Sequence, residues 1–122
     1  MEARAVSKYV RSSPRKMRIV VNVVRGLPVT EALNTLHFMP QRAARAVETT
    51  IQSAIHNLID LNDDVHIDEE EIVVREIKVD QAPMFKRIRP APRGRAHRIR
   101  KRNSHLTVIV GLPEEASEDL DF

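Results

Sequence analysis

The residues best suited to chemistry in this sequence are basic, and most of them fall in one window. Residues 86–102 contain nine lysines and arginines and no acidic residue. Seven of the nine are arginines, whose planar guanidinium groups can donate two hydrogen bonds to one phosphate. Such a density of like charge opposes compaction unless a polyanion neutralises it. The window therefore indicates nucleic-acid binding, with a solvated run of surface charge as the alternative.

A second basic cluster lies near the N-terminus. Arg15 and Lys16 would occupy the first turn of a helix, where positive charge opposes the helix dipole but free backbone N–H groups can receive a phosphate. This placement favours a role in binding over a role in stability, so we interpret the cluster as an RNA contact, with an ordinary exposed face as the alternative. The cluster comprises Arg4, Lys8, Arg11, Arg15, Lys16 and Arg18.

Other kinds of chemistry find little support in the sequence. There is no cysteine, and hence no disulfide and no thiolate metal site. The five histidines lack the paired helical spacing of zinc ligands, and the acidic run at residues 68–71 lacks the spacing and the glycine of a calcium loop. No nucleophile–base pair or phosphate-cradling glycine loop is recognisable. We expect no metal, no cofactor and no enzymatic activity, and we interpret the acidic run as a solvated loop.

Length and composition set the class of protein. A chain of 122 residues with 42% hydrophobic residues suits one domain with a modest core. The net charge of +3 conceals a separation of signs, because residues 60–80 carry nine acids and residues 114–122 carry five acids and no base. We expect a single domain over residues 1–112 and an acidic, disordered tail over residues 113–122. No apolar run is long enough to span a bilayer and no signal peptide is evident, so we expect a soluble intracellular protein without a membrane partner.

Helical periodicity predicts the elements that carry the N-terminal cluster. Residues 3–11 alternate loosely, as in a strand, and Ser13-Pro14 is typical of a helix start. That helix would end at Gly26. A short second helix is predicted over residues 30–38 and a longer third helix over residues 41–61. The apolar faces expected for the first and third helices are Met17, Val20, Val21 and Val24, and Ala44, Val47, Ile51, Ala54, Ile55 and Leu58.

Two strands enclose the basic window. In the first, over residues 72–79, Val73 and Ile77 would face one side and Val74 the other, and residues 106–110 form the second. Their connection is far longer than an ordinary hairpin loop. We therefore expect both strands to continue through the basic window as a projecting ribbon.

The tip of that ribbon is predicted from residues that favour turns. Pro90, Pro92 and Gly94 would form the reversal, because proline cannot donate to a ladder and glycine tolerates a tight turn. The predicted fold class is α+β, with three helices packed on a small antiparallel sheet and one long protruding β-hairpin.

Four segments of the sequence carry a resemblance to a known family. They are SSPRKMRIVVNVVRG at residues 12–26, TEAL at 30–33, SAIHN at 53–57, and IKVDQAPMFKRIRPAPRGRAHRIRKRNSHLTVIV at 77–110. In this order they are similar to the family of bacterial-type large ribosomal subunit protein twenty-two, over residues 3–111. Ala82 and the pair Ala91-Pro92 depart from the usual pattern of that family.

The resemblance implies a function and a set of partners. It implies a structural constituent of the large ribosomal subunit that binds its large ribosomal RNA, assists its assembly and contacts neighbouring ribosomal proteins, without an obligate homo-oligomer. It also implies that the tip of the hairpin lines the nascent-peptide exit tunnel and meets the nascent polypeptide. The residues implied at the tip are Met84, Phe85, Lys86, Arg87, Ile88, Arg89, Pro90, Ala91, Pro92, Arg93 and Gly94.

The basic clusters and the resemblance together define the expected RNA-binding residues. Ser13 enters the set through the resemblance alone. The full set is Arg4, Lys8, Arg11, Ser13, Arg15, Lys16, Arg18, Lys86, Arg87, Arg89, Arg93, Arg95, Arg98, Arg100, Lys101 and Arg102.

Two other functions stay open at this point. A DNA-bending architectural protein with a basic β-ribbon arm could wedge its prolines into the minor groove. An RNA-modifying enzyme has only the basic surface in its favour. Aromatic residues make up 3% of the chain, which argues against a module that stacks single-stranded bases on aromatic platforms.

Overall fold

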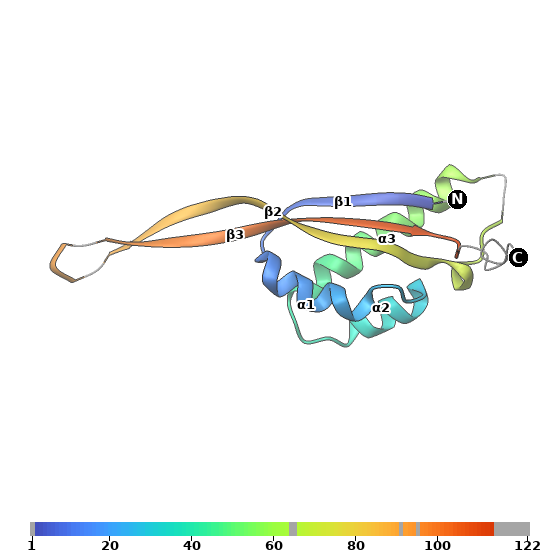
Figure 1. Ribbon diagram of the computed structural model, residues 1–122, viewed down its shortest axis with the longest axis horizontal. Helices are drawn as coiled ribbons and strands as arrows, with labels where there is room; N and C mark the ends of the chain where they lie inside the picture. Colours follow the sequence, from blue (N-terminus) through green and yellow to red (C-terminus); the bar gives the residue numbers. More distant parts are fainter. Residues whose placement is uncertain (1, 64–65, 91, 95, 114–122) are drawn as a thin grey trace, which may run out of the picture.

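In the part of the chain that the structure describes, three antiparallel strands form one sheet in the order β1-β3-β2, and three α-helices accompany it (Figure 1). The computed structural model describes residues 2–63, 66–90, 92–94 and 96–113, with the backbone alone for residues 85–90 and 96–101. Ala91, Arg95 and the tail from residue 114 onward lie outside the described residues, so the expectations for them stay predictions. The elements are β1 (Glu2–Val10), α1 (Pro14–Val24), α2 (Val29–His37), α3 (Ala43–Leu61), the 3-10 turn η1 (Glu69–Glu71), β2 (Val73–Pro90), the 3-10 turn η2 (Pro92–Gly94) and β3 (Ala96–Gly111).

Helix α1 begins and ends at the residues that the sequence predicts. The Ser13 hydroxyl accepts a hydrogen bond from the Lys16 N–H at 3.3 Å, which caps the first turn, and Pro14 occupies a position where no amide donor is needed. The chain leaves the helix through Gly26, whose φ of +80° is accessible to glycine at little cost. The predicted apolar face, from Met17 to Val24, is fully buried.

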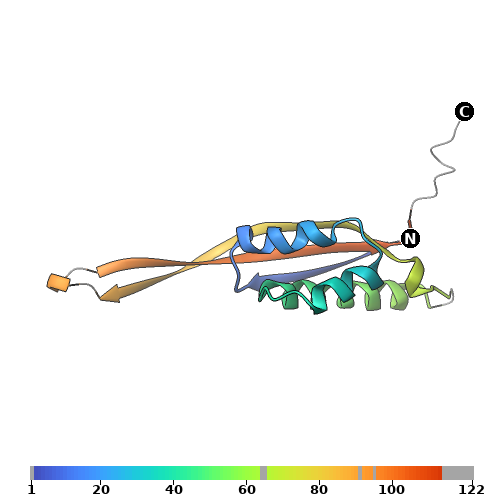
Figure 2. The same cartoon turned by 90° about the horizontal axis from the view of Figure 1, so that it is seen from below.

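Helix α3 is the longest helix and lies beside β1 and β3, while α1 lies beside β2 (Figure 2). It begins at Ala43, two residues later than predicted, and α2 begins at Val29, one residue earlier. All six predicted apolar positions of α3 are buried. Thr50 lies on the same face, and its hydroxyl is paired with the Ala46 carbonyl and the Ser7 hydroxyl, each at 2.7 Å.

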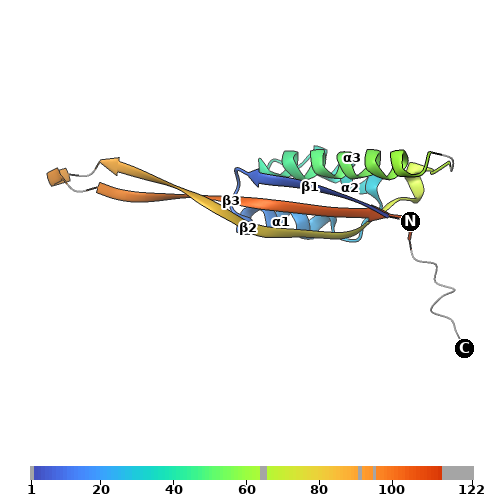
Figure 3. The ribbon, with the colours of Figure 1, turned by 90° about the horizontal axis from the view of Figure 1, so that it is seen from above.

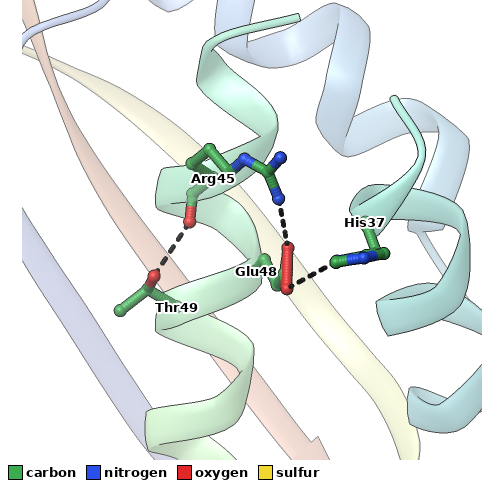
Figure 4. A network of polar contacts seen from close by, with 4 residues as sticks. All are labelled: His37, Arg45, Glu48 and Thr49. Atoms are coloured by element: carbon green, nitrogen blue, oxygen red, sulfur yellow. Dashed lines mark hydrogen bonds and ion pairs between the residues drawn. The ribbon is translucent and has the colours of Figure 1, made fainter. Parts of the chain in front are cut away.

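An ion-pair cluster joins the end of α2 to the start of α3 (Figure 4). The Glu48 carboxylate lies 3.9 Å from His37 Nδ1 and 3.5 Å from Arg45 Nη1. The Thr49 hydroxyl donates to the Arg45 carbonyl at 2.9 Å. Of these contacts only the one between His37 and Glu48 spans the two helices, because Arg45, Glu48 and Thr49 all belong to α3.

The predicted faces of the strand before the arm are partly wrong. Val74 is buried and Val73 is only half-buried, the reverse of the expected alternation. The reason is a β-bulge: Val74 pairs with Val110 and Glu76 pairs with Ile109, so Arg75 is an extra residue in β2. The extra residue places Val74 and Ile77, three positions apart, on the same side of the sheet.

A second irregularity interrupts β1 close to its end. The register between β1 and β3 shifts between Ser7 and Val10, and Tyr9 within this shift has a φ of +56°. A left-handed backbone costs a residue other than glycine about 1–2 kcal/mol. The Tyr9 N–H donates to His105 Nδ1 at 3.1 Å, and the two rings meet edge to face with centroids 4.9 Å apart.

Among the described residues, helices cover one face of the sheet and none covers the other. Figure 3 looks at the strands with α1 behind them, and Figure 2 shows α1 in front. Ala5, Val108 and Ile77 form one cross-strand row toward the helices and are buried. We call the other side the bare face; it carries Arg4, Val6, Lys8 and Lys78, all exposed, together with His105.

Beyond the end of β1 the two remaining strands continue as the predicted ribbon (Figure 1). We define the arm as the β2–β3 ladder from the pair Ala82–Asn103 to the pair Pro90–Ala96, together with η2. Nine residues of an extended strand span about 30 Å. Within η2, Arg93 and Gly94 are both left-handed, with φ of +62° and +71°. The expected projecting hairpin is thus confirmed, and so is the predicted α+β class.

Candidate nucleic-acid interface

Three arginines from two distant parts of the chain meet where the arm leaves the sheet. Arg15, Arg18 and Arg102 line a shallow cavity of about 140 Å³ together with Pro14 and Gln81. We call it the root pocket. None of its five lining residues is acidic, and Arg15 and Arg102 are exposed. Guanidinium groups that converge on one hollow are suited to a phosphate, because each can donate two parallel hydrogen bonds to its oxygens.

The local fold explains why these arginines converge. Arg102 and Ser104 are two apart on β3 and so face the helix side of the sheet. The buried Ser104 hydroxyl donates to the Ser12 carbonyl at 2.6 Å, which ties the start of α1 to β3 at this point. Arg18 Nη2 donates to the Val79 carbonyl at 3.1 Å, which ties α1 to β2 as well. Together the two bonds hold the N-terminal half of α1 against the sheet next to the base of the arm.

A bulge in β2 lies at the start of the arm. Ala82 pairs with Asn103 and Phe85 pairs with Lys101, so β2 has one residue more than β3 between these pairs. Pro83 occupies the bulge, where its missing N–H leaves no ladder bond unmade. Its carbonyl accepts a hydrogen bond from Asn103 Nδ2 at 3.1 Å, and Asn103 is buried.

The register of the arm places cations next to one another. Lys86 is paired with Arg100, two like charges directly opposite, an arrangement that destabilises an antiparallel pair. Arg89 is paired with His97, and Ile88 with Arg98. A two-stranded ribbon without a third layer is marginal in water even when its charges are balanced. We therefore expect the arm to be more stable when phosphate groups surround it than when it is free in solution.

The other predicted RNA-binding residues do not all join the root pocket. Lys16 and Arg11 are exposed close to it in sequence but do not line it. Arg4 and Lys8 lie on the bare face instead. Ser13 serves as the cap of α1, although its hydroxyl hydrogen is still able to donate to a phosphate.

The side chains of several predicted residues fall outside what the structure describes. For these residues the backbone positions on β2 and β3 are known; the RNA contacts expected of the lysines and arginines and the place at the tunnel tip expected of residues 85–90 stay predictions. They are Phe85, Lys86, Arg87, Ile88, Arg89 and Pro90 on β2 and Arg98, Arg100 and Lys101 on β3. At the tip, Pro92, Arg93 and Gly94 are exposed, and Met84 at the base is half-buried.

Negative charge gathers at the end of the molecule away from the arm. The turn η1, with its exposed Glu69, Glu70 and Glu71, follows α3 there (Figure 1). The expectation of a solvated acidic loop is confirmed in its exposure, with the addition that Asp68 caps the turn by accepting from the Glu70 N–H at 3.1 Å. Among the described residues no group of histidines and acids has the arrangement of a metal site. In the same part of the chain no helix is both long and apolar enough to cross a membrane.

Two residues that contribute to this region were not predicted from the sequence: Gln81 at the base of the arm, and Arg25 at the other end of α1. Gln81 lines the root pocket, but an uncharged residue beside nine cations carries no signal of its own. Arg25 follows α1 outside the predicted cluster, and its Nη1 donates to the Ile77 carbonyl at 2.7 Å. Arg25 therefore serves the attachment of α1 to β2, a role that sequence spacing does not reveal.

Comparison with known proteins adds a family to this geometry. The family model described as ribosomal protein L22p/L17e matches residues 5–111. The chain is 48% identical over 119 residues to the large ribosomal subunit protein uL22 of Salinibacter ruber, covering 98% of each chain. It is 52% identical over 110 residues to the protein of the same name from Chloroflexus aggregans, covering 90% of this chain and 95% of the relative. It is 44% identical over 118 residues to the protein of the same name from Chlorobium limicola, covering 97% of this chain and 100% of the relative.

Proposed function

Because this chain belongs to the ribosomal protein L22p/L17e family, we propose that it is a structural constituent of the large ribosomal subunit. It binds large-subunit ribosomal RNA through the root pocket and the arm. The observation that carries the proposal is the arm itself, because its register sets Lys86 opposite Arg100 and no helix covers it. Phosphates on both sides of the ribbon would remove that repulsion and release counterions, which contributes affinity.

The proposal extends to the place of the arm in the subunit. The family resemblance supports a tip, from Met84 through Gly94, that lines the nascent-peptide exit tunnel and meets the nascent polypeptide. The length of the arm, about 30 Å by strand geometry, suits an element that reaches from the body of a small protein into an RNA wall. Its neighbours would be ribosomal RNA and other large-subunit proteins, in the cytoplasm and bound to the ribosome.

The mode of action in this proposal is binding and positioning. The root pocket holds a phosphate where α1 meets the sheet, and the arm passes between RNA segments and ties them together. An element that neutralises phosphates from several segments lowers their mutual repulsion, which is how the protein would assist assembly. No catalytic step, metal or cofactor is part of this mechanism.

Sedimentation separates this function from the DNA-bending alternative. The full chain, carrying an affinity tag, is expressed in a bacterium, and a lysate is run through a sucrose gradient at moderate salt. We expect the protein to stay with large-subunit particles through the gradient, because many phosphate contacts act together. Recovery mainly in the nucleoid fraction, with large subunits free of the protein, would overturn the proposal in favour of DNA bending.

A further inference from the structure

Among the side chains that the structure describes, Tyr9 is the one exposed tyrosine or phenylalanine beside the base of the arm. It is the only tyrosine in the sequence, and 57% of its surface is exposed. It follows Lys8 on β1 and precedes Arg11, both exposed cations, and its ring meets the ring of His105 on the bare face. An exposed aromatic between cations is the arrangement by which proteins stack bases of single-stranded RNA.

The backbone of Tyr9 makes this placement unusual. Among the described residues only Tyr9 and Arg93 have a positive φ without being glycine. Arg93 lies in the reversal at the tip of the arm, where a left-handed residue is ordinary. Tyr9 lies in a strand at a bulge, a position that normally takes glycine. Strained backbone of this kind clusters at binding and active sites, which makes Tyr9 a candidate for a binding residue.

Both contacts of Tyr9 are made with His105, and most of the Tyr9 side chain remains exposed to solvent. The N–H of Tyr9 donates to His105 Nδ1, and the edge-to-face contact orients one ring against the other. His105 is paired on β2 with Asp80, an exposed acid. An acid at this position disfavours a phosphate beside the ring and leaves an uncharged group, such as a base, as the better occupant.

We propose that an unpaired base of the ribosomal RNA stacks on the ring of Tyr9, with Lys8 and Arg11 on the phosphates that flank it. This inference rests on the proposed function, since the base must belong to the RNA that the protein binds. It assigns the bare face near the arm to RNA as well, so that RNA is contacted on both faces of the sheet, at the root pocket on one and at Tyr9 on the other.

Variants at Tyr9 separate the ring from the fold. Tyr9→Gly removes the ring and relieves the positive φ, so the protein should fold and melt close to the wild-type temperature; Tyr9→Asn is a second variant that tolerates this backbone. In filter binding of the full chain to purified large-subunit ribosomal RNA, both should weaken binding by about 5- to 150-fold, the range seen when one stacked aromatic is lost. Tyr9→Phe keeps the ring and should stay within about twofold of wild type.

Chemical nitration gives a second readout that does not depend on affinity. Since Tyr9 is the only tyrosine, tetranitromethane modifies one ring, and mass spectrometry reports how fast it reacts. We expect reaction in the free protein and strong protection in the RNA complex. Equal rates of nitration in the free protein and in the RNA complex overturn the inference. Full RNA affinity in Tyr9→Gly overturns it too, because the ring would then serve only to pack against His105. If wild type itself fails to bind the RNA, the proposed function has failed instead.

Discussion

The root pocket makes a quantitative prediction about salt dependence. We consider Arg15→Gln and Arg102→Gln, alone and together, and leave Arg18 intact because it also donates to the Val79 carbonyl and its loss would disturb the attachment of α1. The slope of log affinity against log salt counts the phosphates that are neutralised, at about 0.7–0.9 for each. Three arginines around one cavity of about 140 Å³ should serve one phosphate and count once.

The expected magnitudes follow from that geometry. Each single variant should lower the slope by at most about 0.7–0.9, and the double variant should lower it by about 0.7–0.9 in total, not by twice as much. Loss of a hydrogen bond to a charged group costs about 1.5–3 kcal/mol. Because Arg15 and Arg102 are exposed, we take the lower end, which corresponds to roughly a tenfold loss of affinity at low salt for the first substitution.

The assay is filter binding of the full chain to large-subunit ribosomal RNA over a series of potassium chloride concentrations. Arg75→Gln is the matched control: it removes the same unit of charge from β2, but Arg75 is paired with Glu2 at 3.0 Å in the sheet and lies outside the arm and the root pocket. Its slope should equal that of wild type. Additive losses in the double variant would mean two separate phosphates and refute the shared pocket, whereas unchanged slopes would place both arginines away from RNA.

Three further predictions concern the arm and helix α1. Replacement of the arm beyond the pair Phe85–Lys101 by an Asn-Gly turn should weaken RNA binding. It should leave the melting temperature within a few degrees of wild type, because the hydrophobic core lies between the helices and the sheet and not in the arm. An unfolded variant in circular dichroism would contradict the claim that the domain folds without the arm. Ser13→Asp should preserve the cap of α1 and its stability but weaken RNA binding through repulsion, whereas Ser13→Ala should cost about 1 kcal/mol in urea unfolding; equal RNA affinity in Ser13→Asp would remove Ser13 from the interface. Gly26→Ala should cost about 1–2 kcal/mol through its φ of +80° alone, since an added Cβ would meet no atom within 4 Å, and no loss of stability on urea unfolding would contradict this.

The sequence predicted best what depends on local signals. The limits of α1 follow from Ser13, Pro14 and Gly26, each of which acts on its own few residues. The arm was predictable because the connection between two apolar strands was too long for a loop. The family resemblance was likewise carried by segments in order along the chain, and the comparisons confirm it.

What the sequence left out depends on the pairing of distant strands. The bulge at Arg75 that moved Val74 into the core is set by the register with β3 and has no local marker. The same holds for the bulge that gives Tyr9 its positive φ, because a tyrosine carries no sign of a left-handed backbone. The root pocket joins α1 to β3, so Arg15 and Arg102 were each predicted to bind RNA, but not to share one site.

Hydrogen exchange of the arm amides, measured by mass spectrometry on the free protein and on the protein within large subunits, tests directly whether RNA surrounds the arm. In the free protein we expect the arm to exchange faster than the strand segments beside the helices, because a two-stranded ribbon with cations opposite one another is marginally stable. Within the subunit, the arm amides should slow to the level of the sheet. Equal exchange of the arm in both states would contradict the claim that ribosomal RNA surrounds and stabilises it.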